Sequence, residues 1–115
     1  MTKSLNYKME NQLKLIQLQQ DRNFFTMIII LGVIFNYIAF SSNGFQMPVK
    51  TEHHFNNGFH FSFQENSEVK LWALTDIFNI KDRFVFSLGD VIILLGIISL
   101  FINQFKVFRR RNVKQ

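Results

Sequence analysis

The stretch FFTMIIILGVIFNYIAF, from Phe24 to Phe40, decides the class of this protein. It contains no charged residue. As a helix with a rise of 1.5 Å per residue, its roughly 17 residues reach the lower limit for crossing the hydrocarbon core of a bilayer. Arg22, just before it, can extend its side chain to the headgroups and lengthen the span. The stretch therefore predicts a membrane-spanning helix over residues 24–40.

A second apolar run, FSLGDVIILLGIISLFINQF, extends from Phe86 to Phe105 and predicts a second spanning helix over residues 88–105. Ser87 and Asp90 at its start have the Ser-x-x-acid spacing of a capping box, in which the two side chains bond to each other's backbone amides. This spacing favours a structural capping role for Asp90 over a chemical one. No catalytic residue is assigned.

The net charge of +5 is unevenly distributed along the chain. Counting side chains gives about +2 before the first apolar run, about −2 between the runs and about +5 after the second. Positive flanks beside membrane helices face the cytoplasm. This pattern predicts a multi-pass protein with both termini in the cytoplasm, and it favours a lipid bilayer over nucleic acid as the partner of the basic ends.

The residues before the first run have the pattern of an amphipathic helix over 5–20. Leu5, Met9, Leu13 and Ile16 recur at intervals of three and four residues. Such a helix lies either on the membrane surface or on a partner protein, and amphipathic leaders favour the membrane surface.

The stretch IAFSSNGFQMPVK, from Ile38 to Lys50, follows the first run. Ala39 and Ser41 are spaced like the small residues before a signal-peptidase cut, but the leader and the apolar core are both longer than those of a signal peptide. We therefore expect a retained helix rather than one cleaved before Ser42. Asn43 and Gly44 predict a turn. Pro48 restricts Met47 to extended geometry. The structural turn is therefore assigned to Asn43, Gly44, Met47 and Pro48.

The middle of the chain predicts a small α+β cap outside the membrane. Phe59, Phe61 and Phe63 alternate with polar residues, as in a strand with one apolar face that points into the cap. The preceding Asn57-Gly58 predicts a hairpin with residues 49–55. The segment SEVKLWALTDIF, residues 67–78, has helical periodicity and would place Trp72 at headgroup level.

The predicted fold class is mainly α-helical, with two antiparallel transmembrane helices, an N-terminal amphipathic helix and a small extracytoplasmic cap. In chain order the segments are a cytoplasmic amphipathic helix (1–23), a spanning helix (24–40), the cap (41–87), a second spanning helix (88–105) and a basic cytoplasmic tail (106–115).

Small and polar residues mark where membrane helices touch. Gly32 and Asn36 share a face of the first helix. On the second, Gly89, Gly96 and Asn103 recur every seven residues, with Ser99 adjacent. We expect these faces to meet each other or to bind a partner helix. An antiparallel arrangement would place Thr26 at about the depth of Asn103.

An ordered set of short motifs links these segments: GVIFNYIAFSSNGFQMPV, then LWALTDIF, then FSLGDVIILLGI. Together they resemble a family of small bacterial integral membrane proteins of unknown function, over residues 31–102. The matching positions are Asn36, Asn43, Gly44, Met47, Pro48, Val49, Asp76, Ser87, Gly89, Asp90, Val91 and Gly96. The resemblance implies a protein of the bacterial cytoplasmic membrane whose outer loop folds onto the helix ends. Family members tend to carry more membrane helices before the Asn-Gly element, which implies that this shorter form relies on a partner.

Histidines and a carboxylate in the predicted cap raise the question of a metal site. His53, His54, His60 and Asp76 carry groups that bind zinc or transfer protons. Their spacing matches no known ligand pattern, and adjacent histidines in a strand point to opposite faces. Three exposed loop histidines are the favoured interpretation. We expect no cofactor, and the absence of cysteine excludes disulfides and thiolate ligands.

Three functions remain open from the sequence. The first is a non-enzymatic accessory or assembly subunit whose cap and helices contact a membrane-protein partner or further copies of itself. The second is a membrane-embedded enzyme or metal-binding protein that uses the loop histidines and aspartates. The third is a small pore-forming or immunity-type protein. Convergence of two histidines and a carboxylate would favour the second, and an uncovered apolar face would favour the first.

Overall fold

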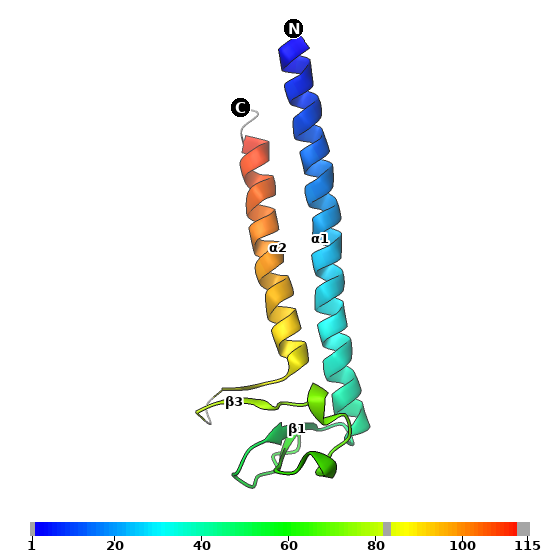
Figure 1. Ribbon diagram of the computed structural model, residues 1–115, viewed down its shortest axis with the longest axis vertical. Coiled ribbons are helices and arrows are strands. Elements are labelled where there is room, and N and C mark those ends of the chain that lie inside the picture. The colour runs from blue at the N-terminus through cyan, green and yellow to red at the C-terminus, as the bar shows by residue number, and fades with distance from the viewer. Residues whose placement is uncertain (1, 82–83, 113–115) are drawn as a thin grey trace.

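The computed structural model describes residues 2–81 and 84–112. Two long helices, α1 (Thr2–Ser42) and α2 (Leu88–Asn112), lie side by side, and the residues between them form a small cap at one end. The start of α1 and the end of α2 lie at the other end of the helices, away from the cap (Figure 1). Asp82, Arg83 and the last three residues of the predicted basic tail lie outside the described residues.

The first helix, α1, continues unbroken through the boundary predicted between residues 23 and 24. The junction contains no glycine, and the only proline of the chain is Pro48, so nothing in the sequence interrupts the backbone hydrogen bonds there. Its 41 residues correspond to about 60 Å of helix. Both α1 and α2 are long and apolar enough to cross a membrane, judged by length and composition.

The two helices contact each other through residues spaced seven apart. We call this contact the helix seam: Asn11, Leu18 and Gly32 of α1 with Gly89, Gly96 and Asn103 of α2, all of them buried. A Cβ added to Gly32 would lie 2.7 Å from the carbonyl oxygen of Gly89, so the two backbones approach closely. A period of seven residues keeps a straight contact line only when two helices wind gently around each other.

The axial register of the seam differs from the prediction. The side-chain amide of Asn103 donates a hydrogen bond of 2.9 Å to the carbonyl of Leu18, so Thr26 does not lie opposite Asn103. The displacement of eight residues along α1 amounts to about 12 Å. Small residues identify a contact face but do not fix how far one helix slides along the other.

The cap contains a short parallel pair of strands, β1 (Met47–Lys50) and β2 (His60–Phe63), with Pro48 opposite Phe61. The other edge of β1 bonds to Asp76: the Asp76 amide donates to Pro48 and the Lys50 amide donates to Asp76. Pro48 has no amide hydrogen to leave unpaired in this arrangement. Pro48, Phe63 and Thr75 are fully buried and form the core of the cap.

The predicted hairpin between residues 49–55 and the phenylalanine strand forms only next to its turn. There the Ser62 amide donates to the Phe55 carbonyl, and Asn56 makes an isolated antiparallel bridge with Phe61. Residues 49 and 50, in β1, run parallel to β2 instead. The Asn57 side chain accepts the backbone amides of Phe59 and His60, which makes a local turn. Because β2 begins only at His60, Phe59 stays 72% exposed while Phe63 is 2% exposed.

The predicted helix over residues 67–78 is also wrong. The segment forms two 3₁₀ turns, η1 (Asn66–Glu68) and η2 (Trp72–Leu74), separated by Leu71 in the left-handed conformation at φ 52°. The Asn43 side chain accepts the amide of Lys70 and donates to its carbonyl, both at 2.9 Å. This tertiary contact occupies the two backbone groups that an α-helix needs at Lys70.

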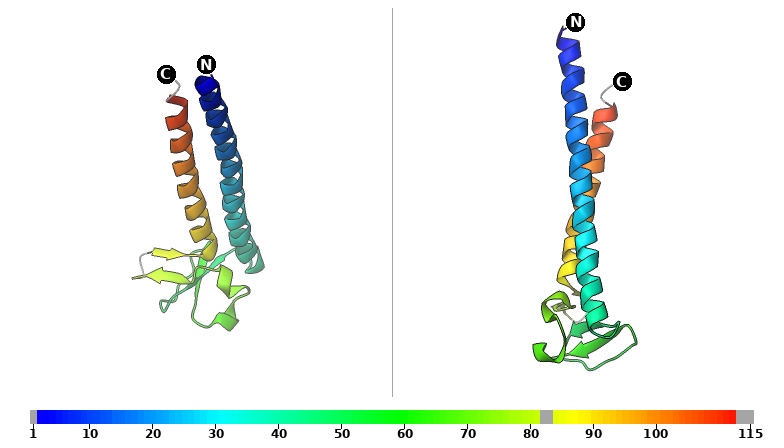
Figure 2. Two further views of the ribbon diagram at one scale, coloured as in Figure 1. Left: turned by 45° about the horizontal axis from the view of Figure 1, so that its top comes forward. Right: turned by 90° about the vertical axis from the view of Figure 1, so that its right-hand side faces the viewer.

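An antiparallel pair of strands, β3 (Phe78–Ile80) and β4 (Phe84–Phe86), leads the chain from the cap into α2. The Phe78 and Phe86 rings stack with centroids 5.3 Å apart. Figure 2 shows these strands projecting to one side below the helices. Residues beside the seam are exposed on both helices, and only 11% of the most apolar window of each is buried within the chain.

Candidate functional site

Three polar side chains form a closed ring where α1, α2 and the cap meet. The Ser87 hydroxyl donates to Oδ1 of Asn36 at 2.6 Å, and Nδ2 of Asn36 donates to Oδ1 of Asp90 at 2.8 Å. Oδ2 of Asp90 accepts the Ser87 backbone amide at 3.1 Å. We call these three residues the polar ring. It ties one helix to the start of the other at the end that carries the cap.

Within the ring, Ser87 and Asp90 have the geometry of a capping box. The Asp90 amide donates to the Ser87 hydroxyl oxygen at 3.1 Å, and the Ser87 amide donates to the Asp90 carboxylate. Both bonds satisfy amides that the first turn of a helix leaves without intrahelical partners. A negative side chain in the first turn also interacts favourably with the helix dipole. The Asp90 carboxylate is thus occupied by bonds within the chain.

Asn36 joins this capping box to α1, a contact that the sequence did not predict. The pattern assigned Asn36 to the helix contact because polar residues mark such faces, but nothing in the spacing paired it with Ser87. Gly89 makes the approach possible, since a Cβ at that position would collide with the Asn36 side chain and lie 2.6 Å from the carbonyl oxygen of Gly32. The hydrogen bonds of the polar ring therefore require a glycine at position 89.

The remaining predicted packing residues also lie at or beside the helix seam. A Cβ on Gly96 would lie 2.5 Å from a side-chain carbon of Ile29. Ser99 is partly buried. Asn103 is buried and donates to Leu18, while its Oδ1 atom has no hydrogen-bond partner among the described residues.

The predicted turn residues connect α1 to the cap. The Phe45 amide bonds back to the Phe40 carbonyl at 2.9 Å, and Gly44 and Phe45 adopt positive φ angles of 72° and 59°. This conformation closes the carboxyl end of α1. Asn43 then holds the backbone of Lys70, as described above, and β1 begins at Met47. The turn therefore directs the cap back against the ends of the helices.

Asp76 is the most perturbed ionisable group among the described residues. It is 6% exposed, and burial, together with the negative charge of Asp90, raises the pKa of Asp76 from 3.8 to about 7. Nε2 of His60 lies 3.8 Å from Oδ2 of Asp76. The pair thus places a histidine beside a carboxyl whose raised pKa lies near neutral pH.

The histidines do not converge on a metal site in the described part of the chain. No group of three or more His, Cys, Asp or Glu residues there is arranged to hold a metal ion. Nδ1 of His54 lies 3.4 Å from the Ser62 hydroxyl, whereas His60 faces Asp76. The structure thus joins His60 to Asp76 and does not add His53 or His54 to them as a ligand set.

Comparison with known proteins gives a family and no activity. A family of unknown function, DUF5317, matches residues 12–102. This covers most of the chain, which therefore belongs to that family. No curated protein gives a significant match, and no solved structure does so either.

Proposed function

We propose that this chain is a two-pass membrane protein in which α1 and α2 cross the bilayer antiparallel. The basic ends would face the cytoplasm and the cap would lie outside. Three observations support this topology. Both helices are long and apolar enough to span, the net positive charge gathers at the end away from the cap, and exposed apolar side chains surround the helix seam. The resemblance to small bacterial membrane proteins supports the cytoplasmic membrane of a bacterium.

We further propose that its role is that of a non-enzymatic accessory or assembly subunit. The observation that carries this proposal is an uncovered apolar face on the first half of α1, the outer stripe formed by Leu5, Met9, Leu13 and Ile16. These side chains are 55–63% exposed. On a helix they lie opposite the positions of Asn11 and Leu18, which contact α2.

In the proposed topology lipid tails reach at most the Ile16 end of the outer stripe, because Leu18 lies level with Asn103 near the end of the apolar run of α2. Because α1 is unbroken, its first 20 residues continue the direction of the span and extend roughly 30 Å beyond Phe24. A helix lying flat on the membrane would require a break near Asn23 that the structure does not have. An apolar helical face in water is stabilised by docking on another apolar surface. A membrane-protein partner with a cytoplasmic helix or groove fits this face.

The cap supports the same conclusion at the opposite end. Phe45, Phe59 and Phe84 are 60–72% exposed although they lie outside the two spans. Large exposed aromatic side chains are typical of protein contacts and of the membrane interface. The side chains of the polar ring, in contrast, form their hydrogen bonds within the chain. This supports a structural rather than a chemical role for these residues.

The test is purification in mild detergent from membranes of the source cell, with stoichiometric partners identified by mass spectrometry. The double variant Leu5→Ser/Leu13→Ser should lose a partner that the wild type retains. The matched variant Leu94→Ser/Leu95→Ser removes two exposed leucines of α2 and should retain it. A partner kept by the first variant, or wild-type protein that purifies alone and monomeric, would refute the proposed role.

One observation favours a second candidate function, a proton-transferring enzyme that uses His60 and Asp76. Their separation of 3.8 Å and the raised pKa of Asp76 are features of groups that exchange protons near neutral pH. The variants His60→Gln and Asp76→Asn test it. Loss of proton flux by purified protein in both variants, with folding intact, would favour this candidate over the accessory role.

A further inference from the structure

At the end of the helices away from the cap, α1 and α2 diverge and leave a pocket of about 560 Å³ between them. Cations from both helices line it. We call it the basic pocket; its lining includes Lys14 of α1 and Lys106, Arg109 and Arg110 of α2, together with Asn11 and Leu18. No aspartate or glutamate of the described residues lines it.

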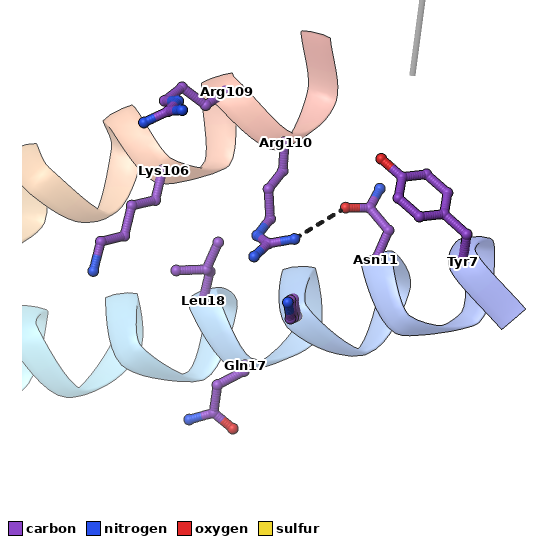
Figure 3. A pocket seen from close by; sticks show the side chains of 8 residues that line it. Tyr7, Asn11, Gln17, Leu18, Lys106, Arg109 and Arg110 are labelled. Atoms are coloured by element: carbon purple, nitrogen blue, oxygen red, sulfur yellow. Dashed lines mark hydrogen bonds between the residues drawn. The ribbon is translucent and has the colours of Figure 1, made fainter. Parts of the chain in front are cut away.

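Two cationic side chains of the basic pocket extend from α2 toward α1. Figure 3 shows Lys106 and Arg110 extending from α2 toward α1, with Leu18 between the helices. The Arg110 guanidinium reaches the Asn11 side chain, Nη1 to Oδ1, at 3.4 Å. Asn11 is itself buried. This contact orients the guanidinium across the mouth of the gap, while its other donors stay available because an arginine has five.

The chemistry of the basic pocket suits a phosphate group. Four positive side chains without a lining carboxylate create a local field that favours an anion. Arginine presents paired donors that match two phosphate oxygens, and lysine adds a mobile point charge. Leu18, with the aliphatic stems of the lysines, forms an apolar floor beside the cations.

The position of the pocket along the helices indicates which phosphate it takes. Lys106 follows directly after the apolar run of α2, and Leu18 lies level with Asn103 in that run. In the proposed two-pass topology, on which this step rests, the pocket opens at the depth of the cytoplasmic headgroups. Basic pockets between membrane helices on that side bind anionic headgroups.

We propose that the basic pocket is a specific binding site for the phosphodiester headgroup of an anionic phospholipid. The phosphate lies between Lys14 of α1 and Lys106 and Arg110 of α2, and the glycerol end of the lipid rests on Leu18. The lipid thereby bridges the two helices beside the contact of Arg110 with Asn11.

The experiment titrates detergent-solubilised full chain with short-chain phosphatidylglycerol, phosphatidylcholine or inorganic phosphate. Bound ligand is read by native mass spectrometry and by the shift in melting temperature. The pocket variant is Lys14→Gln/Lys106→Gln. The matched control Lys8→Gln/Arg111→Gln removes the same charge from the same two helices at exposed positions that do not line the pocket. Circular dichroism verifies that both variants keep their helices.

We expect phosphatidylglycerol to bind the wild type and the control with the same affinity. We expect it to bind the pocket variant with an affinity lower by roughly tenfold or more. Phosphatidylcholine should bind all three weakly. Equal losses in both variants would overturn the proposal in favour of diffuse attraction to a basic surface, as would equal binding of the two lipids. If inorganic phosphate binds as tightly and shows the same dependence on the variants, the ligand is a soluble phosphate and the lipid assignment is wrong.

The titration does not require the chain to cross a bilayer. Its failure is therefore distinguishable from failure of the proposed topology, which a separate labelling experiment measures. A chain that binds the headgroup in detergent but does not span would contradict the topology alone. A chain that spans but ignores the headgroup would contradict the pocket alone.

Discussion

Asn36 shows how a single side chain holds the junction between helices and cap. It accepts from Ser87 and donates to Asp90, two residues more than 50 positions away in the sequence. Ser87 is fully buried, so its hydroxyl loses the acceptor that Asn36 provides if Asn36 is removed. An unsatisfied buried polar group costs more than an ordinary hydrogen bond contributes. Asn36 therefore has a larger expected effect on stability than its modest exposure suggests.

We predict that Asn36→Ala lowers the free energy of unfolding by about 1–3 kcal/mol. The measurement is chemical unfolding in detergent followed by circular dichroism. Asn23→Ala, an exposed position on the same helix, is the control and should change stability by less than about 0.5 kcal/mol. Equal effects of the two substitutions would contradict the role of the polar ring.

The buried carboxyl of Asp76 makes stability depend on pH. Its pKa is about 7 in the folded chain and 3.8 as the model value. Between about pH 4 and 7 the unfolded chain releases this proton while the folded chain keeps it, so this contribution to stability falls as the pH rises. Above that window both states are ionised and the contribution no longer changes. Burial is the main cause, with the charge of Asp90 second.

We predict that Asp76→Asn flattens the fall in melting temperature between pH 4 and 7, because the variant cannot ionise there. A series of thermal unfolding curves across this range measures it. Glu52→Gln, which changes an exposed carboxylate of the cap, should keep the wild-type slope. If Asp76→Asn shows the same slope as the wild type, another group causes most of the pH dependence of the melting temperature.

The two helices illustrate what sequence patterns specify and what they leave open. The repeat of Gly89, Gly96 and Asn103 is visible in the sequence because glycine and asparagine stand out in an apolar run. The matching repeat on α1 includes Asn11 and Leu18, which do not stand out among polar neighbours and a separate leucine stripe. The axial register depends on Asn36 meeting Ser87, a contact between residues far apart in the chain that periodicity does not encode.

The segments of the cap follow the same principle. The helical periodicity over residues 67–78 is present, but Asn43 takes both backbone groups of Lys70 and Leu71 turns left-handed. The alternation of Phe59, Phe61 and Phe63 identifies a strand correctly, but the predicted hairpin gives residues 49 and 50 the wrong direction, since a parallel pairing with β1 leaves no local signal. Tertiary contacts overrode local preference at these places.

We predict that Gly32→Ala destabilises the helix pair. Alanine favours helix over glycine by about 1 kcal/mol, so a purely local effect would stabilise α1. The added Cβ would instead lie 2.7 Å from the Gly89 carbonyl oxygen, a backbone atom that cannot move aside alone. Overpacking of this kind costs about 1–3 kcal/mol.

Thermal unfolding in detergent measures this balance. Val33→Ala, at the exposed neighbouring position, is the control and should be neutral or slightly stabilising because alanine is the better helix former. A gain in stability for Gly32→Ala would show that the two backbones do not approach each other at the helix seam.

At the scale of the whole molecule, charge, hydropathy and shape agree. The principal axes measure 71 × 26 × 19 Å, and the long axis exceeds the thickness of a bilayer's hydrocarbon core, about 30 Å. The net positive charge lies at one end and the cap lies at the other. Family membership adds no activity. The central claim is therefore the topology: both helices span, and the cap and the basic ends lie on opposite sides of the membrane.

Cysteine accessibility tests that claim most directly, because the chain contains no cysteine of its own. Single variants Ser67→Cys in the cap and Asn112→Cys at the end of α2 place one thiol on an exposed residue in each region. Spheroplasts are treated with a membrane-impermeant maleimide before and after permeabilisation. We predict that Ser67→Cys reacts in intact spheroplasts and Asn112→Cys only after permeabilisation. Labelling of Asn112→Cys in intact spheroplasts, or equal labelling of both, would contradict the two-pass topology.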